Sequence, residues 1–226
     1  MTREEFLNQL PQMVEDYQPA SDVLTRIGNV TLCMIVGPSG AGKSTLIEHS
    51  GFSFVPSDTS RYPRPGEQEG VDMYFRQDYD QVIADITAGR FVQIALFATG
   101  DMYATKGTSY PESGVAIMPV MADVIPVFRS LGFNKTITAF AAPPSYGEWM
   151  RRMTVNPLTD EQRTRRLAEA RRSFEFAISD KDIHFVLNDD VEAAARQLKD
   201  LLEGKIDTAR EEQANETTRT LLKAIS

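Results

Sequence analysis

The stretch Val30–Leu46, VTLCMIVGPSGAGKSTL, decides the fold. An apolar run is followed by a glycine-rich turn and then by residues typical of a helix start. Gly37, Gly42, Lys43 and Ser44 complete the pattern G-x-x-x-x-G-K-[ST], which requires a strand before it and a helix after it. Glycines let backbone N–H groups surround phosphate oxygens, and the helix N-terminus adds its positive dipole end. The stretch predicts a phosphate-binding loop, with an ordinary glycine-rich turn as the alternative.

Residue types within this loop suggest how it binds its ligand. Lys43 would bridge the β- and γ-phosphates of ATP, and the Ser44 hydroxyl would hold Mg²⁺. We therefore expect ATP as the phosphoryl donor and Mg²⁺ as the metal cofactor. The loop residues expected to bind ATP are Gly37, Pro38, Ser39, Gly40, Ala41, Gly42, Lys43, Ser44 and Thr45.

Composition argues against several classes of protein. The 226 residues, 42% of them hydrophobic, suffice for one core with a small inserted lobe. A net charge of −8, from 24 basic and 32 acidic residues, argues against nucleic acid or an anionic membrane as a partner. The single cysteine, Cys33, lies in an apolar run, so no disulfide framework is expected. No apolar run nears the roughly 18 residues of a membrane span and no signal peptide is evident, so we expect a cytoplasmic protein.

A polar segment that begins at Ser57 is the second candidate site. It follows a short apolar run that reads as a strand, and it should leave the sheet at the strands' carboxyl ends, where the phosphate loop also lies. Arg61 and Arg64 could then bind a second phosphate, with hydroxyl donors from Ser57 and Tyr103. Solvated loop arginines are the alternative.

Several motifs in order resemble those of guanylate kinases. PSDTSRYPRPGEQEGVD, at Pro56–Asp72, resembles the family's nucleotide-binding segment, S-x-T-T-R-x-P-R-x-G-E-x-x-G-x-D-Y. GDMYAT at Gly100–Thr105 is similar to G-N-x-Y-G-[ST]. APPS at Ala142–Ser145 resembles the strand end before the family's lid, and NDD at Asn188–Asp190 the close of its last strand. The resemblance runs from about Val30 to Leu202.

The resemblance implies an α/β protein with the P-loop kinase fold, in which a doubly wound parallel sheet carries an inserted nucleoside monophosphate-binding lobe and a helical lid. Alternating strands and helices with short links also indicate a parallel doubly wound sheet. The expected organisation is a helical extension over residues 1–29, a kinase domain over 30–202 and a tail over 203–226. Within the domain, residues 57–112 form the lobe and 145–175 the lid.

Roles for single residues also follow from the resemblance. Glu67 matches a glutamate that supports the lobe, and Thr105 a hydroxyl residue that faces the guanine. Arg152 and Arg166 match lid arginines that close on the transferring phosphoryl group, and Asn188 falls where the family contacts adenine. The residues expected to act in catalysis are Lys43, Arg61, Arg152 and Arg166, and those expected to bind the monophosphate are Ser57, Arg61, Arg64, Glu67, Tyr74, Gln93, Tyr103 and Thr105.

Three departures from the family pattern affect the acceptor. Met73 stands where a second phosphate-gripping tyrosine is usual, and Tyr74 comes one place later. Gln93 replaces a glutamate that reads guanine, and Met121 lies where D-x-D is usual, with Asp123 the nearest carboxylate. A glutamine offers one acceptor and one donor pair, whereas guanine presents two adjacent donors that suit a carboxylate.

The expected activity is therefore transfer of the γ-phosphoryl group of ATP to GMP or dGMP. A different or modified base, or a phosphorylated sugar as in the ribose bisphosphate phosphokinases, remains an alternative acceptor. Scaffold proteins that resemble guanylate kinases bind peptides without catalysis, but they have lost phosphate-loop residues that this chain retains. The expected partners are small nucleotides, and the oligomeric state is not readable from the sequence.

Overall fold

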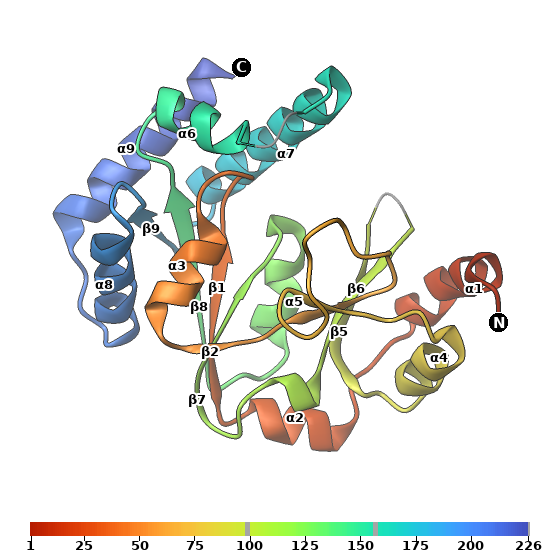
Figure 1. Cartoon of the computed structure of the whole chain (residues 1–226). Coiled ribbons are helices and arrows are strands. Elements are labelled where there is room, and N and C mark those ends of the chain that lie inside the picture. The colour runs from red at the N-terminus through yellow and green to blue at the C-terminus, as the bar shows by residue number, and fades with distance from the viewer. Residues whose placement is uncertain (98–99, 156–157, 226) are drawn as a thin grey trace. The chain divides into compact units, whose positions relative to one another are not determined.

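The computed structural model describes residues 1–97, 100–155 and 158–225 of the chain (Figure 1). The chain divides into two compact units. The first comprises Met1–Thr31, Val55–Ala116 and Pro126–Lys135, and the second comprises Leu32–Phe54, Ile117–Ile125 and Thr136–Ser226. The phosphate loop therefore belongs to the second unit, and the polar segment after Ser57 belongs to the first.

The first unit is built on a four-stranded sheet with the order β4-β3-β6-β5. Its strands are β3 (Ser57–Thr59), β4 (Met73–Phe75), β5 (Phe91–Leu96) and β6 (Met102–Lys106). Strand β3 runs parallel to β4 and antiparallel to β6, which in turn pairs antiparallel with β5. The helical segments of this unit are α1 (Arg3–Glu15), α2 (Ser21–Ile27), α4 (Tyr79–Thr87), η1 (Gly107–Ser109) and most of α5 (Ile125–Ser130).

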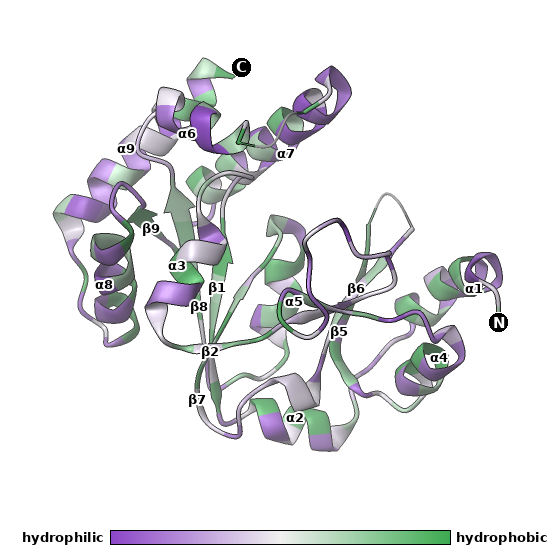
Figure 2. Cartoon of the chain, viewed as in Figure 1, coloured by the Kyte–Doolittle hydropathy of each residue, from purple (hydrophilic) through white to green (hydrophobic). Residues whose placement is uncertain are grey.

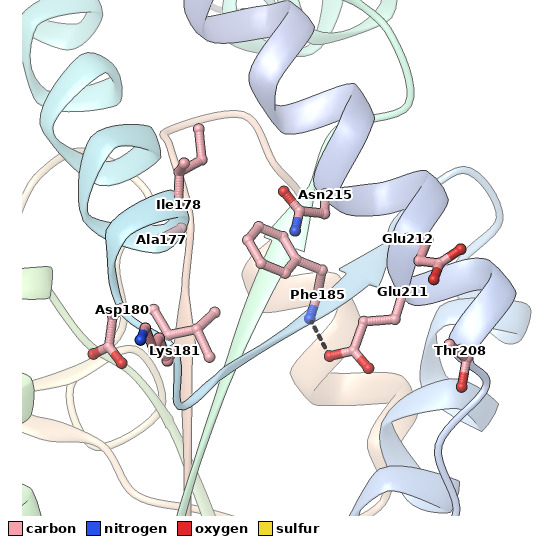
Figure 3. A pocket seen from close by; sticks show the side chains of 10 residues that line it. Ala177, Ile178, Asp180, Lys181, Phe185, Thr208, Glu211, Glu212 and Asn215 are labelled. Atoms are coloured by element: carbon pink, nitrogen blue, oxygen red, sulfur yellow. Dashed lines mark hydrogen bonds between the residues drawn. The ribbon is translucent and has the colours of Figure 1, made fainter.

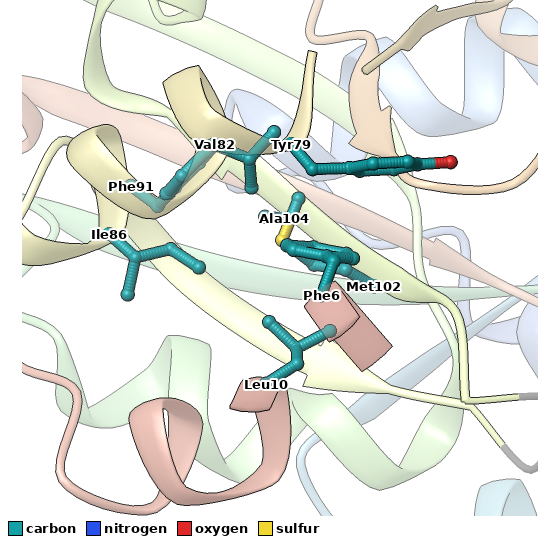
Figure 4. Close-up of a cluster of buried hydrophobic side chains, with 8 residues drawn as sticks. All are labelled: Phe6, Leu10, Tyr79, Val82, Ile86, Phe91, Met102 and Ala104. Atoms are coloured by element: carbon teal, nitrogen blue, oxygen red, sulfur yellow. The ribbon is translucent and has the colours of Figure 1, made fainter. Parts of the chain in front are cut away.

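Helix α1 packs into the core of this unit. It begins with a capping box, in which Thr2 accepts from the Glu5 backbone N–H and Glu5 accepts from the Thr2 backbone N–H. Phe6 and Leu10, four residues apart on one helix face, are fully buried. Figure 4 shows them against α4, β5 and β6, with the Phe6 ring stacked on Tyr79 at 4.8 Å between centroids. The sequence predicted helices here but not that they complete this core.

The second unit is built on a five-stranded sheet with the order β2-β7-β1-β8-β9. Its strands are β1 (Val30–Val36), β2 (Ser53–Phe54), β7 (Gly114–Pro119), β8 (Lys135–Ala142) and β9 (Ile183–Leu187). The first residues of β1, β7 and β8, up to Thr31, Ala116 and Lys135, are counted with the first unit. Strands β8 and β9 are parallel, with Thr138 opposite Ile183 and Ala142 opposite Leu187. Figure 2 shows β1 and β8 as largely hydrophobic, as expected of strands buried on both faces. The predicted α/β class with a mostly parallel sheet is confirmed.

Helices of the second unit are α3 (Lys43–Ser50), α6 (Tyr146–Met153), α7 (Asp160–Ser179), α8 (Val191–Leu202) and α9 (Thr208–Ala224), with the short η2 (Ala122–Val124). Phe174 of α7 packs against Phe140 of β8 and against Trp149 of α6. The expected lid, residues 145–175, thus contains α6 and most of α7, although residues 156–157 lie outside the described part of the chain. Among the described helices, none has the length and apolar content that crossing a membrane requires.

Side chains seal the free edge of β9, the last strand of the five-stranded sheet. Gln197 of α8 donates to the Phe185 carbonyl at 2.9 Å and accepts from the Leu187 N–H at 3.3 Å. From α9, Glu211 accepts from the Phe185 N–H at 3.1 Å (Figure 3), and Arg210 donates to the Leu187 carbonyl at 3.1 Å. Because unpaired edge strands invite pairing with another chain, α9, which lies within the tail expected over residues 203–226, protects this edge.

Candidate active site

Three glycines shape the loop between β1 and α3. Gly37, Gly40 and Gly42 have φ values of 151°, 82° and 85°, a region that residues with a Cβ rarely adopt. A Cβ on Gly42 would lie 2.5 Å from Asn188 Nδ2, and one on Gly40 would lie 3.0 Å from the Met153 backbone nitrogen. The loop therefore needs glycine at these positions both for its backbone conformation and for the close approach of its neighbours.

Lys43 lies at the first position of α3 and turns back into the loop. Its Nζ donates to the carbonyl oxygens of Gly37 at 2.7 Å and Pro38 at 3.1 Å. Burial lowers the pKa of Lys43 to about 8, and the Glu169 carboxylate opposes that shift. The loop thus holds this ammonium with neutral carbonyl groups.

Two residues from distant parts of the chain hold the loop in place. Asn188, which is 4% exposed, donates from Nδ2 to the Ala41 carbonyl at 2.7 Å. Trp149, fully buried in α6, donates from Nε1 to the Ser39 carbonyl at 2.9 Å. Nothing in the local sequence signals the Trp149 contact, because the two partners are 110 positions apart.

Arg152 and Arg166, the two arginines expected in the lid, both contact residues that adjoin the loop. Arg152 donates to the Glu148 carboxylate at 2.7 Å and to the Asn188 carbonyl at 3.1 Å. Its Nη1 lies 3.8 Å from where a Cβ of Gly42 would be. Arg166 donates to the Met153 carbonyl at 3.4 Å, and Met153 is the residue that abuts Gly40. Hydrogen bonds from Arg151 and Arg152 lower the pKa of Glu148 to about 2, so this carboxylate is an ionised anchor for both arginines.

Ser44 and Thr45 lie exposed on the first turn of α3, so their hydroxyls face solvent. No group of three or more His, Cys, Asp or Glu side chains in the described residues forms a metal cage. Mg²⁺ is commonly held by one or two protein oxygens together with substrate phosphates and water. An exposed hydroxyl beside the loop fits that donor set.

In the first unit, Arg61 is the centre of a polar cluster. Its guanidinium binds the Glu67 carboxylate through two hydrogen bonds of 2.7 Å, and its Nε donates to the Tyr103 hydroxyl at 2.9 Å. Its remaining donors reach the Tyr62 carbonyl at 2.9 Å and the Met73 sulfur at 3.3 Å. The bond to Glu67 raises the pKa of Arg61 and lowers that of Glu67, so both stay charged.

Strand register places four of the five expected acceptor-binding residues that lie in strands on one face of the four-stranded sheet. Residues that lie opposite each other on neighbouring strands, or two positions apart on one strand, share a face of the sheet. Ser57 therefore shares a face with Met73, and Tyr103 shares a face with Thr59 and Thr105. Gln93 lies opposite Thr105 on the same face. The members of this set, here called the acceptor face, are Ser57, Thr59, Met73, Phe75, Gln93, Tyr103 and Thr105.

Tyr74 lies on the opposite face. It is paired with Asp58, and the Arg76 guanidinium lies over its ring at 4.6 Å. Arg76 in turn forms an ion pair with the buried Asp58 carboxylate. Met73, one place earlier, points to Arg61 instead. The structure therefore does not bring Tyr74 together with the other expected acceptor-binding residues, because a shift of one position in a strand reverses the face.

Thr105 and Gln93, both on the acceptor face, differ in their hydrogen bonding. Thr105 is fully buried and hydrogen-bonds the Tyr110 hydroxyl at 2.8 Å. Gln93 is 8% exposed, and its amide makes no hydrogen bond with the part of the chain that the structure describes. Among the described residues, Gln93 is not one of those with a buried, unpartnered polar atom, so its amide reaches solvent and is open to a ligand.

Comparison with known proteins identifies the family. The family model described as guanylate kinase matches residues 29–205. A guanylate kinase of Frankia casuarinae is 33% identical over 186 residues, covering 76% of this chain and 97% of the relative. The chain belongs to the guanylate kinase family.

Further matches agree. A human guanylate kinase is 32% identical over 190 residues, covering 78% of this chain and 94% of the relative. The crystal structure of guanylate kinase from Anaplasma phagocytophilum has the same fold, with a TM-score of 0.53 at 21% identity, and the match covers 89% of this chain and 97% of that one. Helices α1 and α9 lie outside the residues that the family model matches.

Proposed function

We propose that the protein transfers the γ-phosphoryl group of ATP to GMP or dGMP, giving ADP and the nucleoside diphosphate. The observation that carries this proposal is the intact phosphate loop of a guanylate kinase family member, with its three glycines at positive φ and Lys43 clasped inside it. Relatives that carry the name guanylate kinase match over most of their length, which supports the same activity here.

We propose that the donor site consists of the loop Gly37–Thr45 with Arg152, Arg166 and Asn188. Lys43 would exchange its loop carbonyl partners for oxygens of the β- and γ-phosphates, and the two arginines would neutralise charge on the transferring group. Asn188, which already contacts the loop, would also contact the adenine. Mg²⁺ held by Ser44 would supply further neutralisation of the β- and γ-phosphate oxygens. Residues 145–175 would act as the lid that excludes water.

The acceptor phosphate would bind on the acceptor face. The Arg61 N–H that now points at the Met73 sulfur has a weak acceptor there, so a phosphate oxygen would replace it at little cost. Tyr103 accepts from Arg61, which leaves its own proton free to donate, and Ser57 adds a second hydroxyl. Arg64 is exposed and would close on the phosphate from the loop, while Glu67 fixes the plane of Arg61.

The reaction itself needs little covalent chemistry from the protein. A phosphate oxygen of the acceptor attacks the γ-phosphorus, the bond from that phosphorus to the β–γ bridging oxygen breaks, and ADP leaves. The residues named above contribute by positioning and by neutralising charge.

The base would be read by Gln93 and Thr105. The Gln93 carbonyl oxygen can accept from guanine N1–H, and its amide can donate to O6. A carboxylate would serve the two adjacent guanine donors better, so we expect weaker discrimination among purines than a glutamate gives.

A coupled assay of ADP release tests the proposal. The purified protein, ATP and Mg²⁺ are combined with GMP, dGMP, IMP, AMP, dTMP, UMP or CMP, and with ribose phosphates as a separate arm. Turnover with GMP or dGMP well above the others is expected. Absence of turnover with GMP and dGMP, when another monophosphate or a sugar phosphate is used, would contradict the acceptor assignment.

A further inference from the structure

Helix α1 lies outside the region that the family model matches, yet it reaches the back of the acceptor face. Arg3 of α1 donates from Nη2 to Asp101 Oδ1 at 2.6 Å. Asp101 precedes β6 and is only 7% exposed. A buried carboxylate is costly unless it is paired, and Arg3 supplies a cationic partner.

The apolar side of α1 determines where Arg3 lies. Phe6 and Leu10 are fully buried against α4 and β6 (Figure 4), and Tyr17, just beyond the helix, donates from its hydroxyl to the Phe91 carbonyl. The capping box at Thr2 fixes the first turn, to which Arg3 belongs. With both ends of the segment fixed in this way, Arg3 is presented to the lobe from a rigid element.

The contact continues from Asp101 to the strands that carry Arg61 and Tyr103. Asp101 Oδ1 also accepts from the Ser60 hydroxyl at 3.4 Å, and Ser60 Oγ accepts from the Met102 N–H at 2.9 Å. Ser60 immediately precedes Arg61, and Met102 immediately precedes Tyr103. The hydrogen bonds that lead from Arg3 through Asp101 therefore link Ser60 to Met102. These two residues immediately precede Arg61 and Tyr103, which are hydrogen-bonded to each other.

Arg3 also contacts the residue on the other side of Arg61. Its guanidinium carbon lies 6.0 Å from the centre of the Tyr62 ring, and the Tyr62 carbonyl accepts from Arg61 at 2.9 Å. Arg3 thus contacts Tyr62 directly and reaches Ser60 through Asp101, so it bears on both neighbours of Arg61.

We propose that Arg3 is a positioning residue for the acceptor phosphate, and that it sets the geometry of Arg61 and Tyr103 through Asp101, Ser60 and Tyr62. This inference rests on the proposed function. Without Arg3, the Asp101 carboxylate loses a cationic partner, and its hydrogen bond with the Ser60 hydroxyl would be less well fixed. The guanidinium of Arg61 would then be held less tightly in the orientation that a phosphate needs.

The test is steady-state kinetics on Arg3→Ala, with GMP and ATP varied separately. We expect KM for GMP to rise about fivefold to tenfold while KM for ATP stays within about twofold. Arg3→Lys, which keeps the charge, should recover part of the loss. In an Arg3→Ala/Asp101→Asn double variant, the neutral amide can still accept from Ser60, so KM for GMP should fall back toward the wild-type value.

Arg90→Ala is the matched control. Arg90 lies in the same unit and forms an exposed ion pair with Asp22, remote in sequence from both residues that flank Arg61. It should leave both KM values unchanged, and melting temperatures of all variants show whether they are folded.

An unchanged KM for GMP in Arg3→Ala would overturn the inference, as would an equal rise of both KM values with a lowered melting temperature, which indicates general destabilisation. Failure of the proposed function looks different, because the wild-type protein would then show no turnover with GMP.

Discussion

Lys43 in the phosphate loop and Arg61 on the acceptor face are two cations expected to meet phosphate, and the protein holds them differently. Lys43 donates to two neutral backbone carbonyls, and the Glu169 carboxylate opposes the lowering of its pKa by burial. Arg61 is bound on two sides by the Glu67 carboxylate and the Tyr103 hydroxyl.

The difference indicates two tasks. An ammonium held only by carbonyls keeps its charge for a ligand and can move onto it, which suits the highly charged β- and γ-phosphates. A guanidinium paired with a carboxylate has much of its charge neutralised, but its plane is fixed, which suits accurate orientation of a monophosphate. Lys43 is thus expected to neutralise charge on the phosphates of ATP, and Arg61 is expected to orient the acceptor phosphate.

The largest expected effect comes from removing the charge in the loop. Lys43→Met should lower kcat by about 10³-fold or more, because charge on the transferring phosphoryl group loses its neutralising partner. GMP binding, measured by titration calorimetry without ATP, should stay within about twofold. A variant that keeps a tenth of wild-type activity would contradict the role given to Lys43.

A substitution that keeps the positive charge at Arg61 tests whether the geometry of the guanidinium matters in addition to its charge. Arg61→Lys keeps the cation but cannot bind Glu67 in a bidentate manner while donating to Tyr103, so KM for GMP should rise about 30- to 100-fold. KM for ATP should change little. Arg90→Lys, at an exposed ion pair, serves as the control. Near-normal KM for GMP in Arg61→Lys would mean that charge alone is sufficient at this position.

Crowding at Gly42 gives a smaller effect on the donor side. Gly42→Ala places a Cβ 2.5 Å from Asn188 Nδ2 in a strained conformation with φ of 85°, so KM for ATP should rise about tenfold and the melting temperature should fall. Gly204→Ala is the matched control, since Gly204 has φ of 80° and open space around it. Equal behaviour of the two variants would show that backbone strain, and not displacement of Asn188, causes the loss.

The smallest effect concerns acid pH. Arg61 holds the pKa of Glu67 below its ordinary value of 4.5, so the ionised pair contributes its full stabilisation above that pH and loses it as the pH falls through the lowered pKa. Glu67→Gln lacks this pair. The difference in unfolding free energy between wild-type protein and variant, from urea denaturation followed by circular dichroism, should therefore shrink between about pH 5 and 3. A constant difference would show that the pair is not ionised in the folded protein.

The sequence was informative where function is encoded by neighbouring residues. The strand, loop and helix around Gly37–Ser44 follow from one contiguous pattern. Family membership followed from ordered motifs and is confirmed.

The features that the sequence did not predict depend on contacts between residues far apart in the chain, or on which face of the sheet a strand residue points to. The Trp149 bond to Ser39 joins positions 110 apart, and the face of Tyr74 depends on a pairing register that composition does not reveal. The roles of the two terminal helices also depend on distant contacts, because Phe6 completes a core and Glu211 covers a strand edge. The roles assigned to individual site residues stay predictions until the variants above are measured.

The sealed edge of β9 also bears on how the chain is made. The side chains that cover Phe185 and Leu187 come from Gln197, Arg210 and Glu211, which are synthesised later, the last of them 26 positions after Phe185. Because the two α9 contacts form only after that helix has been made and has packed, the Phe185 N–H and the Leu187 carbonyl stay without these partners until late in folding. Docking of α9 is therefore the step that completes the protection of this sheet edge.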